Sequence, residues 1–299
     1  MKDQYIPEDC FPMEINPRVR LLGNYFFNLT LITGPEKSAL FEAGISGVAD
    51  QVIRQLDHLE IEPDFLVVSH PHSDHITGLP ALMDKFPDAK VIAGKGAKDF
   101  ISHPKAGPAL IKEDEFMSQG LEKMGITPGR ESLKTIPNLD NAIEISTRER
   151  LELGKDIFLD LIPVKGHSPG NLIGLTGPDK VLCCSDSLGF HYPGRKFWPL
   201  FFTSAKDYIE TIELIRSLEP QILCPAHQGP IFGDQVKDAI DQSDTQTKKM
   251  IQRIQQTKME DPDLVTELFD ESYRDEFTLY TEQNILNCTR LLLKRAREI

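Results

Sequence analysis

The sequence has 299 residues, of which 40% are hydrophobic and 26% are charged, a balance typical of a folded chain rather than a disordered one. Its 33 basic and 46 acidic residues give a formal net charge of −13 without any basic block, which disfavours binding to nucleic acid or to an anionic membrane surface. No apolar run approaches the roughly 18 residues of a membrane span, and the first residues do not resemble a signal peptide, so we expect a cytoplasmic protein. The five cysteines lack CxxC spacing and predict reduced core thiols.

Short strands and helices alternate in the first third of the chain. β-rich or continuous apolar runs bounded by turn residues predict strands at 18–23, 25–34, 37–44, 64–70 and 89–94. Apolar residues at helical spacing predict a helix at 47–59, and a second helix is expected at 77–86. The less regular segment 95–135 is interpreted as an insertion over the core, with a helix at 116–125 that is bounded by prolines.

The same alternation resumes after the insertion. Strands are predicted at 142–146, 148–154, 156–166, 171–177, 180–186 and 221–227. A helix is predicted at 204–218, and the pattern is helical throughout 234–299, where the last segment has a broad apolar face. We therefore expect a layered α/β domain over 1–233, with sheets at the centre, and a helical extension that packs on it as core, as a pocket lid or as the surface of a homodimer.

Histidine is scarce in this chain, yet three of the eight histidines fall within six residues. They belong to the segment SHPHSDHITGLP, which follows the buried strand at 64–70. His70 and His72 are two positions apart, so they point the same way in extended geometry, and Asp74 and His75 follow in the turn. Three imidazoles and a carboxylate suit a divalent ion such as zinc. A metal site is therefore predicted, and a histidine-rich turn without metal is the alternative.

Three further metal-capable side chains follow predicted strands. They are His167 in KGHSPGN, Asp186 in CCSDSLG and His227 in CPAHQGP. Taken singly, each is compatible with a turn, a helix cap or an exposed imidazole. Their repetition at strand ends, where the sites of α/β domains gather, indicates one shared site.

In order and in type, the seven candidate positions resemble the motifs of the metallo-β-lactamase superfamily, and the resemblance extends over about residues 18–233. It implies an αββα sandwich with a helical C-terminal extension. The GHSPGN segment and the extension are most similar to the glyoxalase II-like branch of hydrolases within that superfamily.

The resemblance also implies two divalent ions, with zinc expected first and iron or manganese as alternatives. One ion would be bound by His70, His72 and His167, the other by Asp74, His75 and His227, with Asp186 bridging both. Room remains for a bridging hydroxide, and two ions, two aspartates and one hydroxide leave a net charge of about +1 that can polarise a carbonyl or phosphoryl oxygen. Asp74 is also expected to be catalytic, by steering the hydroxide or passing a proton to the leaving group.

Two positions depart from the family pattern. Glu42 stands where the family often has the aspartate of an Asp-x-Gly turn, and Ser185 stands where relatives often have glycine. A longer carboxylate at 42 is still able to hold a metal ligand in place, or it is an exposed turn acid. The segment 189–202 is expected either to wall the substrate pocket or to pack the domain, and three of its residues are candidates for substrate binding: His191, Tyr192 and Arg195.

We therefore expect a dinuclear metal-dependent hydrolase that uses a metal-bridging hydroxide on a small-molecule ester, thioester or lactone. A phosphodiesterase or nuclease of the same superfamily is the second hypothesis, and the net charge of −13 argues against a nucleic-acid substrate. An oxidoreductase similar to the mononuclear-iron persulfide dioxygenases is the third. Diiron relatives carry Glu in place of His72, which disfavours that branch, and the complete ligand set disfavours an inactive binding protein.

Overall fold

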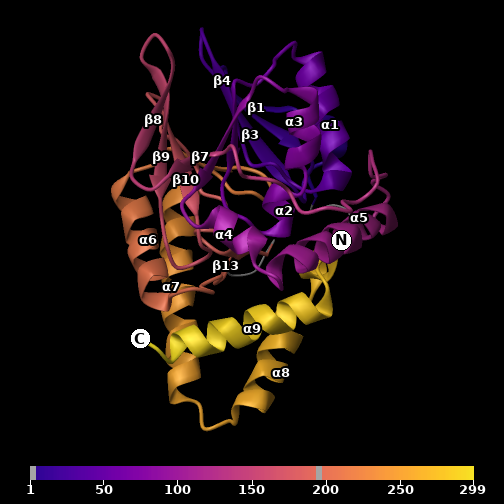
Figure 1. Cartoon of the computed structure of the whole chain (residues 1–299). Coiled ribbons are helices and arrows are strands. Elements are labelled where there is room, and N and C mark those ends of the chain that lie inside the picture. The colour runs from indigo at the N-terminus through magenta and orange to yellow at the C-terminus, as the bar shows by residue number, and fades with distance from the viewer. Residues whose placement is uncertain (1–4, 193–196) are drawn as a thin grey trace.

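Two β-sheets lie face to face at the centre of the molecule, and helices cover the outer face of each sheet (Figure 1). The structure is a computed structural model that describes residues 5–192 and 197–299. In the described part of the chain, the first sheet has the strand order β1-β2-β3-β4-β5-β6-β7, antiparallel from β1 to β4 and parallel from β4 to β7. Its strands are β1 (Met13–Asn16), β2 (Val19–Gly23), β3 (Asn28–Thr33), β4 (Ser38–Phe41), β5 (Phe65–Val68), β6 (Lys90–Gly94) and β7 (Ile143–Ile145).

The second sheet has the order β15-β14-β11-β10-β9-β8, in which β11 and β14 are parallel and the other neighbours are antiparallel. Its strands are β8 (Glu149–Gly154), β9 (Ile157–Pro163), β10 (Leu172–Gly177), β11 (Val181–Cys183), β14 (Ile222–Cys224) and β15 (Ile231–Phe232). A separate antiparallel pair is formed by β12 (Phe190–His191) and β13 (Phe197–Trp198).

The helices lie outside the sheets, with α1 and α3 beside the first sheet and α6 and α7 beside the second (Figure 1). The helix α9 crosses below α4 and α5 in the same view. The bounds are α1 (Ser46–His58), α2 (Ser73–Ile76), α3 (Leu79–Lys85), α4 (Ala97–Ser102), α5 (Ala106–Lys123), α6 (Ala205–Ser217), α7 (Asp234–Gln256), α8 (Asp261–Ser272) and α9 (Glu282–Ala296), with 3-10 helices at Glu8–Cys10 and Asp275–Leu279. No helix in the described ranges is both long enough and apolar enough to cross a membrane.

Three hydrophobic cores separate the four layers. Successive residues of a strand point to opposite faces, so Val67 of β5 joins the core between the sheets, whereas its neighbour Val68 joins the core under α1 and α3. In β11, Val181 lies between the sheets and Leu182 lies in the core under α6 and α7. Residues of α8 and α9 share that last core. The arrangement confirms the predicted αββα sandwich with a helical C-terminal region.

The structure also departs from the expected elements in several places. The very short strands β1, β12, β13 and β15 were not predicted, because segments of two to four residues carry little periodicity. The helix expected at 116–125 begins earlier, at Ala106, because Pro108 lies in its first turn, where a backbone N–H has no intrahelical partner to lose. Three of the cysteines are buried as predicted, but Cys10 is exposed and Cys288 is only partly buried.

Candidate metal centre

The seven side chains that the sequence singles out meet where strands of both sheets end. His70 and His72 follow β5, and Asp74 and His75 lie on the short helix α2 directly after them. The other three come from the second sheet and follow β9, β11 and β14: His167, Asp186 and His227. Their ligand atoms form two groups, and Asp186 belongs to both.

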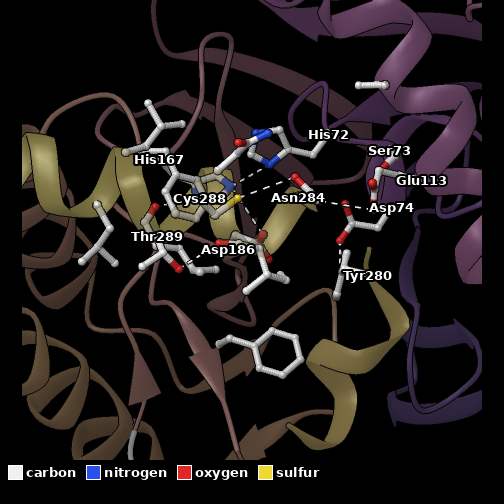
Figure 2. A pocket seen from close by; sticks show the side chains of 18 of the residues that line it. His72, Ser73, Asp74, Glu113, His167, Asp186, Tyr280, Asn284, Cys288 and Thr289 are labelled. Carbon is white, nitrogen blue, oxygen red and sulfur yellow. Dashed lines mark hydrogen bonds and ion pairs between the residues drawn. The ribbon is translucent and has the colours of Figure 1, made fainter. Parts of the chain in front are cut away.

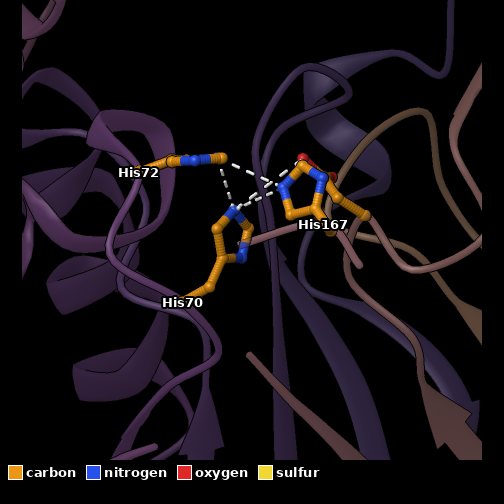
Figure 3. A group of neighbouring side chains, drawn as sticks. His70, His72 and His167 are labelled. Atoms are coloured by element: carbon orange, nitrogen blue, oxygen red, sulfur yellow. Dashed lines mark hydrogen bonds and ion pairs between the residues drawn. The ribbon is translucent and has the colours of Figure 1, made fainter. Parts of the chain in front are cut away.

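The first group is a triangle of imidazole nitrogens (Figure 3). Nε2 of His70 lies 3.0 Å from Nδ1 of His72 and 3.2 Å from Nε2 of His167, and the third edge is 3.1 Å. Oδ2 of Asp186 lies 3.4 Å from Nε2 of His167 and 3.9 Å from Nε2 of His70. Zinc–nitrogen bonds of about 2.0 Å in a tetrahedral site place ligand atoms about 3.3 Å apart, so these separations fit a zinc-sized ion.

The second group has two carboxylates and two imidazoles. Oδ2 of Asp74 lies 3.2 Å from Nε2 of His75 and 3.4 Å from Nε2 of His227. Asp186 lies opposite, with Oδ2 at 3.5 Å from His75 Nε2 and Oδ1 at 3.6 Å from His227 Nε2. Because Oδ2 of Asp186 lies beside His167 and His70 of the first group and also beside His75 of the second, this carboxylate stands between the two groups.

For His167 and His227, a hydrogen bond on the side of the ring that faces away from the cluster determines which nitrogen carries the proton. Nδ1 of His167 lies 2.7 Å from the carbonyl oxygen of Leu200, and Nδ1 of His227 lies 2.6 Å from that of Phe26. A carbonyl oxygen can only accept, so Nδ1 is the donor, and in the neutral ring the lone pair sits on Nε2 and points into the cluster. Within the described residues, Nε2 of His75 and of His227 is buried without a hydrogen-bond partner. Converging lone pairs of this kind repel one another unless a cation lies between them.

Glu42 holds two of the candidate ligands in place. Its Oε2 accepts hydrogen bonds from Oγ of Ser69 at 2.7 Å and from Nδ1 of His75 at 3.0 Å, and the Ser69 hydroxyl lies 3.0 Å from Nδ1 of His70. Glu42 is buried, and its φ of 84° lies in the left-handed region. Ser185, with a φ of 47°, is in the region that glycine adopts readily, and its hydroxyl donates to Ser69 at 3.1 Å. Glu42 and Ser185, the two positions that depart from the family pattern, therefore both form a hydrogen bond with the hydroxyl of Ser69 beside the cluster.

Burial and neighbouring charges set the protonation of the cluster. Burial, reinforced by adjacent imidazoles, lowers the pKa of His70, His167 and His72, the last to about 3. The imidazoles around Asp74 and Asp186 hold the pKa of both carboxyls low against the opposing effect of burial. Burial also opposes charge on the other two imidazoles, but the surrounding carboxylates outweigh it and raise the pKa values of His75 and His227. Neutral imidazoles and ionised carboxylates are the forms that bind divalent cations, so the first group already has the protonation that such an ion needs, whereas His75 and His227 would release a proton when an ion binds the second group.

The C-terminal region adds residues to the site that no sequence motif indicated. The hydroxyl of Tyr280 donates to Oδ2 of Asp74 at 2.8 Å. The next residue, Thr281, is the N-cap of α9, and both its backbone N–H and its hydroxyl donate to Glu113 of α5. The Asn284 side-chain amide donates to the same carboxylate at 3.4 Å. The start of α9 is therefore tied both to α5 and to the ligand cluster.

A cavity of about 310 Å³ opens beside the cluster, between α5, α9 and the pair β12–β13 (Figure 2). His72, His167, Asp74 and Asp186 lie on its wall together with Tyr280. Most of the remaining wall is apolar. The cavity thus gives a small molecule access to both groups of candidate ligands.

The segment 189–202 contributes to this wall, but through other residues than expected. Phe190 and Trp198 line the cavity, whereas His191 and Tyr192 do not. The His191 ring packs at 4.8 Å from the ring of Phe197, and the hydroxyl of Tyr192 donates to the carbonyl oxygen of Ser272 at 2.7 Å. The third candidate for substrate binding, Arg195, lies outside the described residues.

Comparison with known proteins agrees with this geometry. The family model described as Metallo-beta-lactamase superfamily matches residues 23–227. The metallo-beta-lactamase fold-containing protein ST1585 of Sulfurisphaera tokodaii is 28% identical over 203 residues, which cover 67% of this chain and 71% of that protein. A hydroxyacylglutathione hydrolase of Vibrio parahaemolyticus is 29% identical over 184 residues, 61% of this chain and 54% of its own length. The crystal structure of ST1585 from Sulfolobus tokodaii aligns with a TM-score of 0.61 and 21% identity, covering 94% of this chain and 99% of that one, and so shares the fold.

Proposed function

Because the chain belongs to the metallo-beta-lactamase superfamily, which includes metal-dependent hydrolases, we propose that it hydrolyses a small-molecule ester, thioester or lactone with two divalent ions. The observation that carries the proposal is the pair of four-ligand groups that share Asp186. One relative is named hydroxyacylglutathione hydrolase, and this name supports a substrate from which an acyl group is cleaved.

The proposed ligands divide as the two groups do. His70, His72 and His167 would hold one ion, Asp74, His75 and His227 the other, and Asp186 both. Ions bound there, with zinc the first choice, would polarise the substrate carbonyl and lower the pKa of a bound water towards about 7, which supplies a nucleophile at neutral pH.

The protein's own groups would orient that chemistry. Glu42 and Ser69 fix the rings of His75 and His70, and Tyr280 fixes the carboxylate of Asp74. Asp74 also lines the cavity, so its carboxylate is placed to steer the nucleophile or to pass a proton to the leaving group. The apolar walls would exclude bulk water, which strengthens every electrostatic interaction inside the cavity.

The complete second group also bears on the alternatives. An oxidoreductase with a single iron would leave Asp74, His75 and His227 without an ion, although their ligand atoms converge. A nucleic-acid substrate is disfavoured by the net charge of −13, and a small phosphodiester is disfavoured by the acidic Glu113 on the cavity wall.

Replacing the shared ligand tests the proposal. Wild type and Asp186→Ala would be assayed with a panel of thioesters, lactones and phosphodiesters, with Asp88→Ala, which changes an exposed aspartate outside the two ligand groups, as the control. We expect wild type and Asp88→Ala to turn over an acyl substrate and Asp186→Ala to lose most of that turnover. Undiminished turnover by Asp186→Ala would contradict the shared-ligand mechanism, and turnover of phosphodiesters alone would contradict the substrate class.

A further inference from the structure

The residues that line the cavity beside the cluster indicate which class of substrate the cavity holds. We propose that the acyl part of the substrate is an uncharged hydrocarbon chain that lies between α5 and α9. This inference rests on the proposed hydrolase function and specifies the substrate class on which that function acts.

Much of the cavity wall that α5 and α9 contribute is apolar. Ala106, Ala109 and Leu110 contribute from α5, and Ile285 and Leu292 contribute from α9. Burying each methylene group of a ligand against such walls increases affinity up to about fourfold. Hydrocarbon is therefore the ligand chemistry that gains most from this part of the cavity.

At the start of α9, a position in the cavity wall that would suit an anion is already occupied by the protein. A helix N-terminus ordinarily binds carboxylate or phosphate through its free N–H groups. At the N-terminus of α9, the carboxylate of Glu113, which is only 7% exposed, accepts the backbone N–H and the hydroxyl of Thr281. A substrate carboxylate or phosphate placed here would face Glu113 and Asp74 at low dielectric, where like charges repel strongly. Within residues 5–192 and 197–299, no lysine or arginine lines the cavity.

Three polar side chains of α9 in the cavity, Asn284, Cys288 and Thr289, already have hydrogen-bond partners within the protein (Figure 2). The Asn284 amide donates to Glu113, and its oxygen accepts from the Cys288 thiol at 3.7 Å. The Thr289 hydroxyl donates to the carbonyl oxygen of Ile285 at 2.8 Å. A polar substrate tail would have to compete with these bonds, whereas a hydrocarbon tail leaves them intact.

The size and the mouth of the cavity set the expected chain length. Its volume of about 310 Å³ is at the lower end of the roughly 300–1,000 Å³ found for small-molecule pockets. Leu291, which is 38% exposed, and the exposed Ala109 lie on its wall and indicate an apolar entrance between the two helices. A chain of intermediate length fits these dimensions better than an acetyl group does.

A chain-length series tests the substrate class. With p-nitrophenyl esters from acetate to decanoate, we expect kcat/KM to rise two- to fourfold for each added methylene until the cavity is filled. The hemisuccinate ester, whose acyl part carries a negative charge, should be a poor substrate. A preference for acetate or for the hemisuccinate would overturn the inference and leave the hydrolase proposal standing.

A binding measurement separates the two proposals, because it does not depend on turnover. Trp198 is the only tryptophan of the chain and lines the cavity, so its fluorescence should shift on titration with decanamide, a neutral amide, and not with acetamide. Ala109→Phe, which places a ring at the entrance, should weaken decanamide binding at least about tenfold, whereas Gln119→Phe, on an exposed part of α5 outside the cavity, should not. Decanamide binding without hydrolysis of any ester would support the apolar site and contradict the hydrolase proposal. Absence of decanamide binding, or equal binding by Ala109→Phe, would overturn the inference.

Discussion

The Tyr280 hydroxyl donates a hydrogen bond of 2.8 Å to Oδ2 of Asp74, an oxygen that also lies 3.2 Å from Nε2 of His75. The two residues are 206 positions apart, and Tyr280 immediately precedes Thr281, the N-cap of α9. Burial raises the pKa of the Tyr280 hydroxyl well above its usual range, and the nearby carboxylates raise it further. The hydroxyl therefore stays protonated as a donor, and the C-terminal helices complete the surroundings of a proposed metal ligand.

Removing this hydroxyl should weaken metal binding without unfolding the protein. For Tyr280→Phe we expect the dissociation constant of the ion in the second group, to which Asp74 belongs, to rise about 10- to 100-fold, the usual effect of losing a hydrogen bond to a ligand. Competition with a chromogenic chelator measures it. Tyr25→Phe is the matched control, because its buried hydroxyl contacts Glu276 and no ligand. Equal affinities in wild type and Tyr280→Phe would show that the bond does not position Asp74.

Glu42 should matter as a hydrogen-bond acceptor for His75. In Glu42→Gln the side chain keeps its size but loses its charge, so His75 and Ser69 lose a carboxylate acceptor. We expect metal affinity to fall about 10- to 100-fold, measured by the same chelator competition. Glu36→Gln changes an exposed glutamate in the turn between β3 and β4 and should leave affinity unchanged. If the two variants behave alike, Glu42 has no role in holding the ligands.

The anchor at the start of α9 should contribute to folding stability. Glu113→Ala leaves the backbone N–H of Thr281 and the side chain of Asn284 without their acceptor. We expect the free energy of unfolding to fall by about 1–3 kcal/mol, measured in urea. Glu115→Ala, at an exposed position of α5, should change it by less than about 0.5 kcal/mol. A loss of the same small size in both variants would contradict the proposed anchor.

The two ligand groups should release their ions at different pH values. The lowered pKa values of His70, His72 and His167 mean that protons compete with an ion in the first group only in acid, for His72 near a pKa of about 3. The raised pKa values of His75 and His227 mean that protons compete at higher pH in the second group. Dialysis at decreasing pH followed by elemental analysis should therefore show loss of one ion before the other. Simultaneous loss of both ions near pH 6.5 would contradict this order.

Much of the fold and of the ligand cluster follows from local sequence patterns. A few consecutive residues show the continuous apolar run that forms β5 and the spacing of His70 and His72. The candidate metal ligands that follow later strands are visible in the same way. Tyr280 and Glu113 could not be found this way, because they meet the site only through the packing of α5 and α9. The segment 189–202 was recognised as a wall, but a strand pair of two residues each does not reveal in advance that Trp198 faces the cavity and His191 does not.

The metal content of the purified protein tests the central proposal most directly. Elemental analysis of wild type should give close to two divalent ions per chain, because two complete ligand groups share Asp186, and the Asp186→Ala protein should retain fewer than one. A wild-type ratio near one, or iron accompanied by oxygen uptake, would contradict a dinuclear hydrolase.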